Sequence, residues 1–267
     1  MKTNKLSWLI LFFGLLSIQT EAQTKKKERK KELYFSWGYN TEWYTKSNVK
    51  ISQPSLGNNY CFSNISGHDH RGWDEGLFSL AISIPQYNYR LGLFINRKKD
   101  LAVEINFDHT KYIISDQVAQ VKGTINGKNV DSSVNFNAKN GFYYYLNNGA
   151  NFLLFNIVKR WSLHQWKNVR IDVLGKAGIG PLIPHVENAF FGQKNNRGFQ
   201  LGGWNMGVEG TLRSTFFNRV FLEYCNKLDY ARYNGLKVYE GTAKHAFGTY
   251  EMILNLGVCF PVGSKIK

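Results

Sequence analysis

Charged side chains recur at alternate positions in several stretches of this chain, which is the spacing that places them on one face of an extended strand. Carboxylates and cations both occur on these faces, so they could pair with one another if the strands close around them. The residues of this predicted ionic core are Glu42, Arg90, Glu104, Arg170, Asp172, Lys176, Glu209, Arg213, Glu223, Lys227 and Glu251. We expect a structural role for them, as the filling of a polar lumen.

Acid–base chemistry has three weak candidates: His109 with its neighbour Asp108, and His245. A histidine beside a carboxylate can act as a tuned base. Adjacent residues of a strand point to opposite faces, however, so Asp108 is poorly placed to orient the His109 ring. The sequence contains no glycine-rich phosphate loop, no Gly-x-Ser-x-Gly elbow and no His-Glu-x-x-His helix. We therefore assign no catalytic residue and favour a protein that is not an enzyme.

The segment His68-Asp69-His70, with Asp74 and Glu75 nearby, contains candidate metal ligands. Imidazole and carboxylate are suitable ligands, but glycine-rich loop tips rarely hold them in a fixed arrangement. Three cysteines, at positions 61, 225 and 259, are too few and too scattered for a disulfide scaffold, and no Cys-x-x-Cys pair indicates structural zinc. We predict no metal and no cofactor.

Two-residue alternation of apolar and polar side chains defines the elements that must position these groups. In residues 249–260, Tyr250, Met252, Leu254, Leu256, Val258 and Phe260 share one face. Eight such strands are predicted, at 33–44, 82–95, 101–113, 142–163, 169–179, 199–215, 220–230 and 249–260. Long connections at 46–77, 115–141, 180–198 and 231–248 alternate with short turns. A small hairpin is expected at Asn126-Gly127.

This arrangement predicts an all-β fold: an eight-stranded antiparallel up-and-down transmembrane β-barrel with long extracellular loops and short periplasmic turns. Most strands have about the length that a tilted bilayer crossing requires. A lipid-facing Arg or Lys near the midplane would cost about 2 to 4 kcal/mol, so we place the charged face inside. An eight-stranded lumen is filled by side chains, which argues against a wide pore. A secreted, lipocalin-like lipid-binding barrel with inverted faces is the alternative.

The termini carry targeting signals. Residues 1–22 have the basic start, short apolar core and small final residue of a secretory signal peptide. Residues 23–32 form a basic periplasmic leader, 33–260 the barrel and 261–267 a short C-terminal tail. Residues 25–31 carry +5 of the net charge of +14 that remains without the signal peptide, and the leader could contact anionic lipid. The exported address argues against nucleic-acid binding.

With its strands laid out, the chain resembles the small outer-membrane β-barrel family of diderm (Gram-negative) bacteria. The resemblance rests on the signal peptide ending at Ala22, the eight amphipathic strands and the aromatic Phe260 near the C-terminus. It implies an outer-membrane location in the cell envelope, contact with membrane lipids and lipopolysaccharide, and recognition of the last strand by the barrel-assembly machinery. The recognised residues would be Tyr250, Leu254, Leu256, Val258 and Phe260, although the tail after Phe260 departs from the family pattern.

The leading functional hypothesis is a structural or surface-binding role through the long loops, with an unknown ligand. The rival is a lipid A or phospholipid acyl-modifying barrel enzyme. The His-x-Ser pattern of the lipid A deacylase version is absent, since the chain has His109-Thr110-Lys111. A narrow conduit for a small solute is a third hypothesis.

Overall fold

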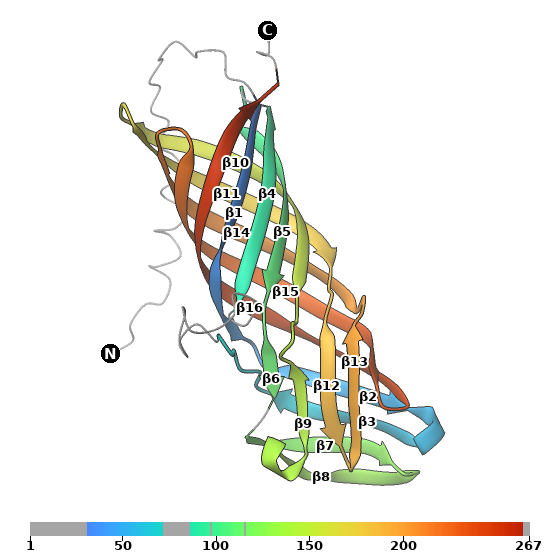
Figure 1. Cartoon of the computed structure of the whole chain (residues 1–267). Helices are drawn as coiled ribbons and strands as arrows, with labels where there is room; N and C mark the ends of the chain where they lie inside the picture. The colour runs from blue at the N-terminus through green and yellow to red at the C-terminus, as the bar shows by residue number, and fades with distance from the viewer. Residues whose placement is uncertain (1–30, 72–85, 97, 115, 264–267) are drawn as a thin grey trace, which may run out of the picture.

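The structure, a computed structural model, describes residues 31–71, 86–96, 98–114 and 116–263. Within these residues, eight strands form a closed antiparallel ring in which each strand pairs with the next and the last pairs with the first (Figure 1). The ring strands are β1 (Lys31–Tyr44), β4 (Tyr87–Asn96), β5 (Leu101–His109), β10 (Phe152–Gln165), β11 (Val169–Pro181), β14 (Gly203–Phe216), β15 (Val220–Val238) and β16 (Gly241–Val262). The predicted eight-stranded up-and-down barrel is confirmed.

The outward face of the barrel is apolar. Its middle zone exposes aliphatic side chains such as Leu91, Ile157 and Leu254. Aromatic side chains are exposed toward both ends, with Trp43, Trp204, Tyr230 and Tyr250 near one rim and Trp161, Phe216 and Phe260 near the other. Tyr250 and Phe260 are ten residues apart on β16, or about 26 Å of height at about 3.4 Å per residue and a tilt of about 40°. This height matches the lipid-facing band of about 25 Å in membrane barrels.

The remaining strands build a second body at one end of the barrel, which we call the dome (residues 45–71, 110–114, 116–151, 182–202 and 231–248). Its strands β2 (Ser47–Gln53), β3 (Asn58–Ile65), β7 (Gln117–Ile125) and β8 (Lys128–Phe136) extend the barrel sheet beyond β16. A separate four-stranded sheet contains β13 (Gln193–Phe199), β12 (His185–Phe190), β9 (Tyr143–Leu146) and β6 (Tyr112–Ile114). Short 3₁₀ turns, η2 (Pro54–Leu56) and η4 (Ala138–Asn140), complete the described dome.

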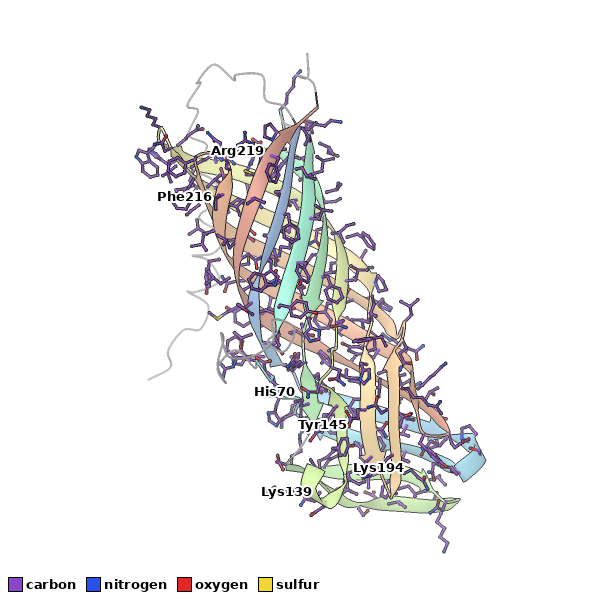
Figure 2. All side chains as sticks on the ribbon, in the orientation of Figure 1. His70, Lys139, Tyr145, Lys194, Phe216 and Arg219 are labelled. Carbon is purple, nitrogen blue, oxygen red and sulfur yellow. The ribbon has the colours of Figure 1, made fainter. Side chains whose placement is uncertain are left out.

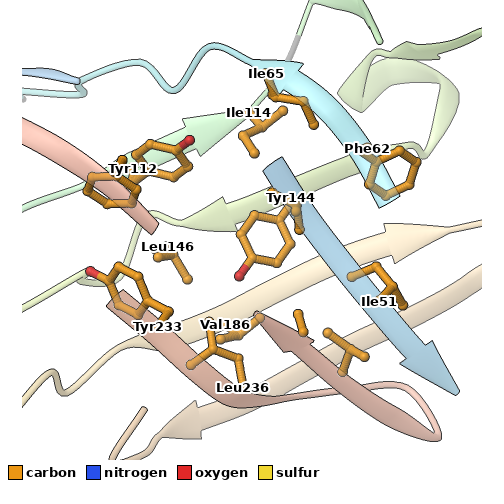
Figure 3. Close-up of a cluster of buried hydrophobic side chains, with 14 of the residues drawn as sticks. Ile51, Phe62, Ile65, Tyr112, Ile114, Tyr144, Leu146, Val186, Tyr233 and Leu236 are labelled. Atoms are coloured by element: carbon orange, nitrogen blue, oxygen red, sulfur yellow. The ribbon is translucent and has the colours of Figure 1, made fainter. Parts of the chain in front are cut away.

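A hydrophobic core fills the space between the two dome sheets (Figure 3). Ile51 and Phe62 come from the extended barrel sheet, Tyr144 and Val186 from the separate sheet, and Tyr233 from β15, and each is at most 1% exposed. The Phe62 ring packs edge-on against Phe136 at 5.0 Å between centroids. The dome is therefore a folded sandwich with its own apolar core.

The two longest strands, β15 and β16, run from the barrel into the dome (Figure 1). The prediction that 231–248 is a connecting loop is therefore wrong, since only Tyr239 and Glu240 separate these strands. The error has a physical cause: the apolar and polar faces of both strands exchange roles within this segment, and the exchange resembles a break in the strand pattern.

The other predicted long connections lie between the correct barrel strands, but the structure fills their described parts with dome strands. The predicted Asn126-Gly127 hairpin is confirmed as the turn between β7 and β8, with φ of 50° and 73° at these two residues. The predicted strands at 101–113 and 142–163 are each two elements, β5 with β6 and β9 with β10, because the chain leaves the barrel wall for the dome at those points.

Short turns and the two ends of the described chain, Lys31 and Gly263, lie at the opposite end of the barrel from the dome (Figure 1). The predicted signal peptide, the leader before Lys31 and residues 264–267 of the tail lie outside the described residues. The described residues contain no helix that is both long enough and apolar enough to span a membrane.

Candidate functional site

The inside of the barrel holds all the charged residues predicted for the ionic core. Glu42, Arg90, Glu104, Arg170, Asp172, Lys176, Glu209, Arg213, Glu223, Lys227 and Glu251 are each at most 7% exposed. The alternation of the strands explains this placement, because these residues share the face opposite the lipid-facing aliphatic side chains. They are not one site: the ion pairs divide into groups at three levels of the lumen.

The central group joins five strands of the barrel. Arg90 Nη1 lies 2.5 Å from Glu209 Oε1, and Lys176 Nζ lies 3.2 Å from the same oxygen. Lys176 also lies 3.0 Å from Glu104 Oε2, which accepts a hydrogen bond of 2.7 Å from the Tyr34 hydroxyl. Cations and carboxylates are matched here, so buried charge is compensated.

Gly92 makes the central group possible. A Cβ at this position would lie 2.1 Å from the Tyr34 ring, so only glycine lets that ring cross the lumen toward Glu104. The residue pairs directly with Tyr34 on β1.

A second group closes the lumen at the end with short turns. Arg160 donates from Nη1 to Glu32 and from Nη2 to Asp100, both at 2.8 Å, while its guanidinium lies 4.0 Å from the centre of the Phe94 ring. Arg213 lies 2.7 Å from Glu223, and Arg170 Nε donates to Asp172 at 2.7 Å. The sequence prediction missed Arg160, because the alternation of β10 is weak and left its facing open.

The third group lies at the dome end, where carboxylates outnumber cations among the described contacts. Lys227 is paired with Asp108, with Asp229 at 2.9 Å and with Glu251 at 3.5 Å. Glu42 stands directly opposite Glu251 in the β1–β16 register and accepts a hydrogen bond of 2.6 Å from Gln86.

Side chains occupy the lumen. The three guanidinium side chains of Arg90, Arg160 and Arg213 are among the largest fully buried groups of the described chain. Their placement, together with the apolar core of the dome above them, matches the expectation for a barrel of this size, whose interior is just wide enough for side chains.

The weak catalytic candidates, His109, Asp108 and His245, each contact other residues and not one another. His109 Nδ1 lies 2.8 Å from Asn151 Oδ1, and its ring stacks on Tyr87 at 4.7 Å, whereas the Asp108 carboxylate binds Lys227. His245 lies inside the dome core, stacked on Tyr233 at 4.8 Å, and burial lowers its pKa to about 3. These contacts hold the histidines as neutral packing groups and do not assemble a nucleophile, base and orienting carboxylate.

The His68-Asp69-His70 segment does not converge on a cation. His68 exchanges main-chain hydrogen bonds with Ile113, His70 Nδ1 lies 2.9 Å from Asn147 Oδ1, and Asp69 accepts a hydrogen bond of 2.9 Å from Thr41. Asp74 and Glu75 lie outside the described residues. Within the described residues, no group of three or more His, Cys, Asp or Glu side chains has a metal-binding arrangement.

The outer face of the extended dome sheet carries a row of cations that the sequence did not reveal. Lys244 of β16 stands directly opposite Lys50 of β2, Lys50 opposite Cys61 of β3, and Cys61 opposite Lys122 of β7. The three lysines are exposed. We call Lys50, Lys122 and Lys244 the lysine row. They are far apart in the chain, and only strand register brings them into line.

The lysine row ends in one acidic neighbour. Lys122 Nζ lies 3.3 Å from Asp131 on β8, with both side chains largely exposed. The pKa of Asp131 is lowered, mainly by a hydrogen bond from the Gln120 side chain and also by contact with Lys122. Lys50 and Lys244 face each other, and like charges directly opposite on a sheet are unfavourable. In one adjacent row Thr242 pairs with Ser52, and Ser52 with Asn59, while Lys237 of β15 stands on the other side of Thr242.

No family model matches this chain, and no curated protein matches it. Among solved structures it resembles small outer-membrane β-barrels. The attachment invasion locus protein Ail of Yersinia pestis, in complex with the heparin analogue sucrose octasulfate, is 14% identical with a TM-score of 0.33, over 86% of this chain and 99% of that chain. The outer membrane protein OprG of Pseudomonas aeruginosa is 10% identical with a TM-score of 0.38, over 88% and 98% of the two chains. Neisserial surface protein A is 8% identical with a TM-score of 0.32, over 85% and 96%. At these values no residue role is transferable.

Proposed function

We propose that this protein is an integral outer-membrane protein whose barrel anchors a rigid extracellular dome, and that the dome binds an anionic polysaccharide through its lysine row. The lysine row carries the proposal. It is displayed on a sheet face that continues into the barrel wall through β16, so strand register fixes the spacing of its backbone positions.

The outer-membrane location is supported by the surface of the barrel. An apolar band flanked by exposed aromatic side chains is the exterior that lipid requires. Long connections face outward in such barrels, and the dome is made of them. Figure 2 labels Lys139 and Lys194 at the dome end and Arg219 at the other end, where the short turns lie.

Charge supports an anionic partner. Lysine and arginine outnumber aspartate and glutamate by more than two to one among the described residues of the dome. Neighbouring strands lie about 4.8 Å apart. Lys244 and Lys50 are therefore one strand spacing apart, and Lys50 and Lys122, with Cys61 between them, are two. The opposition of Lys50 and Lys244 costs stability in the free protein, and a bound anionic group would relieve it.

The height of the row favours a glycan over lipid headgroups. Lys244 is four residues beyond Gly248, where the apolar exterior ends. This is about 10 Å above the apolar band, at about 3.4 Å per residue and a tilt of about 40°. The headgroup layer adds only about 5 to 7 Å to each side of the hydrocarbon core.

The test measures dextran sulfate binding to the full chain in neutral-lipid nanodiscs, with uncharged dextran as the reference polymer. We expect Lys50→Gln, Lys122→Gln and Lys244→Gln together to weaken binding by at least about tenfold, which corresponds to about 1.4 kcal/mol. The matched control replaces Lys128, Lys139 and Lys194, three exposed dome lysines outside the row, by Gln. Equal loss in both triple variants would contradict a specific role for the row, as would binding of uncharged dextran.

A further inference from the structure

A cavity of about 390 Å³ opens at the end of the barrel opposite the dome. It lies between the ends of β1, β10, β11 and β16 and the turn from β14 to β15, which contributes Phe217, Asn218 and Arg219. Lys31, Glu32 and Arg170 complete its charged lining. Neither the lysine row nor the central ion pairs contribute to this cavity.

Arg170 provides a buried donor at the cavity. The residue is 6% exposed and its Nε is satisfied by Asp172 at 2.7 Å. Its Nη2 has no hydrogen-bond partner and lies 3.9 Å from Glu32, whose carboxylate already accepts a hydrogen bond of 2.8 Å from Arg160. A buried guanidinium nitrogen without a hydrogen-bond partner is costly, and an added oxyanion would satisfy it.

Two further cations, Lys31 and Arg219, are exposed at the cavity. Together with Arg170 they place three cations around the carboxylate of Glu32, which already binds Arg160. The cavity volume admits a side-chain-sized group, and an arginine fork matches the geometry of a carboxylate.

We propose that this cavity binds a carboxylate side chain of an acidic peptide on the periplasmic side of the membrane. Arg170 and Cys259 belong to the inward parity of their strands and Phe260 to the outward parity, so the cavity lies at the rim, where the inner and outer faces of the barrel meet. Its entrance cations, Lys31 and Arg219, are exposed at the barrel end that carries the short turns, where a soluble peptide has access. Arg170 is the buried anchor, and Lys31 and Arg219 attract the ligand at the entrance.

The experiment measures binding of a fluorescein-labelled triglutamate peptide to the full chain in phosphatidylcholine nanodiscs, with triglutamine as the uncharged peptide. We expect the Lys31→Gln, Arg219→Gln double variant to weaken triglutamate binding by about tenfold. Both positions are exposed, so barrel folding should be retained. Lys167→Gln is the matched control, because Lys167 is an exposed cation of the neighbouring turn that does not line the cavity.

Arg170→Lys is a second variant, which keeps the charge beside Asp172 and removes the fork. Folding of this variant is checked on gels, where a closed barrel migrates differently before and after boiling. Loss of triglutamate binding with an unchanged shift on boiling supports the role of Arg170 as the anchor. Equal binding of triglutamine, equal effects of Lys167→Gln, or full competition by inorganic phosphate or phosphatidylglycerol would overturn the proposal. Dextran sulfate binding at the dome should be unchanged in all of these variants, so failure here is distinguishable from failure of the lysine row.

Discussion

The barrel and the dome are built from the same alternating strands with opposite chemistry. In the barrel, charged and amide side chains face inward and aliphatic side chains face outward. In the dome, the inward side chains form an apolar core and the outward face of the extended sheet carries lysines, threonines and asparagines. Because a lipid-facing wall and a water-facing wall require opposite exteriors, the difference identifies the solvent around each region.

Strand β16 contains both arrangements in one element. Its odd-numbered residues face inward throughout, but they change from Ala243, His245 and Phe247 in the dome to Thr249 and Glu251 in the barrel. Its even-numbered residues change in the reverse sense, from exposed Thr242 and Lys244 to lipid-facing residues from Tyr250 onward. The exchange occurs near Gly248, without a change of facing, and marks the membrane boundary on this strand.

The largest expected effects separate the two interiors. Phe62→Ala should cost the dome about 3 to 5 kcal/mol, because it removes a fully buried ring from the apolar core. Lys227→Met should cost the barrel about 3 to 5 kcal/mol as well, because it leaves the buried carboxylates of Asp108, Asp229 and Glu251 without their cation.

Different probes measure the loss of stability in the dome and in the barrel. External protease should cut the dome of the Phe62→Ala variant while its barrel band remains heat-modifiable on gels. The Lys227→Met variant should lose that band at a lower temperature and keep a protease-resistant dome until then. If each substitution affects both probes equally, the two interiors are not independent.

The two exteriors of β16 are compared by placing the same cation on each. Leu254→Arg should cost about 2 to 4 kcal/mol and reduce assembly into membranes, because residue 254 faces lipid at mid-height. Thr242→Arg, on the same face of the same strand but in the dome, should assemble normally. Membrane-fraction yield and heat-modifiability measure both. Equal yields would mean that the face assignment of β16 is incorrect.

The dome interior should be sensitive to acid through His245. Its pKa is about 3 in the folded dome and near 6.5 when exposed, so stability from the neutral ring is complete above pH 6.5 and is lost as the pH falls toward 3. The expected loss at pH 5 is about 2 kcal/mol. Hydrogen exchange at Phe247, corrected for the intrinsic rate, measures it at pH 5.0 and 7.5. The His245→Phe variant should lose most of this pH dependence, and an unchanged dependence would point to another group.

The smallest expected effect has opposite signs for stability and binding. Lys50→Glu replaces a like-charge pair with an opposite-charge pair across from Lys244, which should stabilise the dome by about 0.2 to 1 kcal/mol. The same substitution should weaken dextran sulfate binding. Lys128→Glu, an equal change of charge outside the row, is the control for both measurements. If Lys50→Glu changed dome stability and dextran sulfate binding in the same direction, the lysine row would not be the binding site for dextran sulfate.

Sequence patterns predicted the barrel well because alternation over ten or more residues is a strong signal, and because the inward charges of β11, β14 and β15 lie at even spacings along each strand. They did not predict the dome. Its strands are short, and their partners lie far away in the chain, as Cys61 and Lys122 illustrate. Register between such strands is a tertiary property, so the lysine row has no signature in local sequence.

Two other failures have specific causes. Arg160 was missed because neighbouring residues of β10, such as Leu153 and Leu154, are apolar on both faces. The outer parts of β15 and β16 were assigned to a loop because apolar residues switch parity there, which mimics an irregular segment. In both cases the solvent on each side of the strand, and not the strand propensity, determines the pattern.

The most direct test of the exchange on β16 is a cysteine scan of its outward face. In a Cys61→Ser background, single cysteines replace Thr242, Lys244, Ala246, Tyr250, Met252 and Leu254, and intact cells are treated with a membrane-impermeant maleimide. Cys225 and Cys259 are buried and should remain unlabelled. Labelling at 242, 244 and 246 with protection at 250, 252 and 254 is the predicted result. Uniform labelling along the whole face would contradict the account.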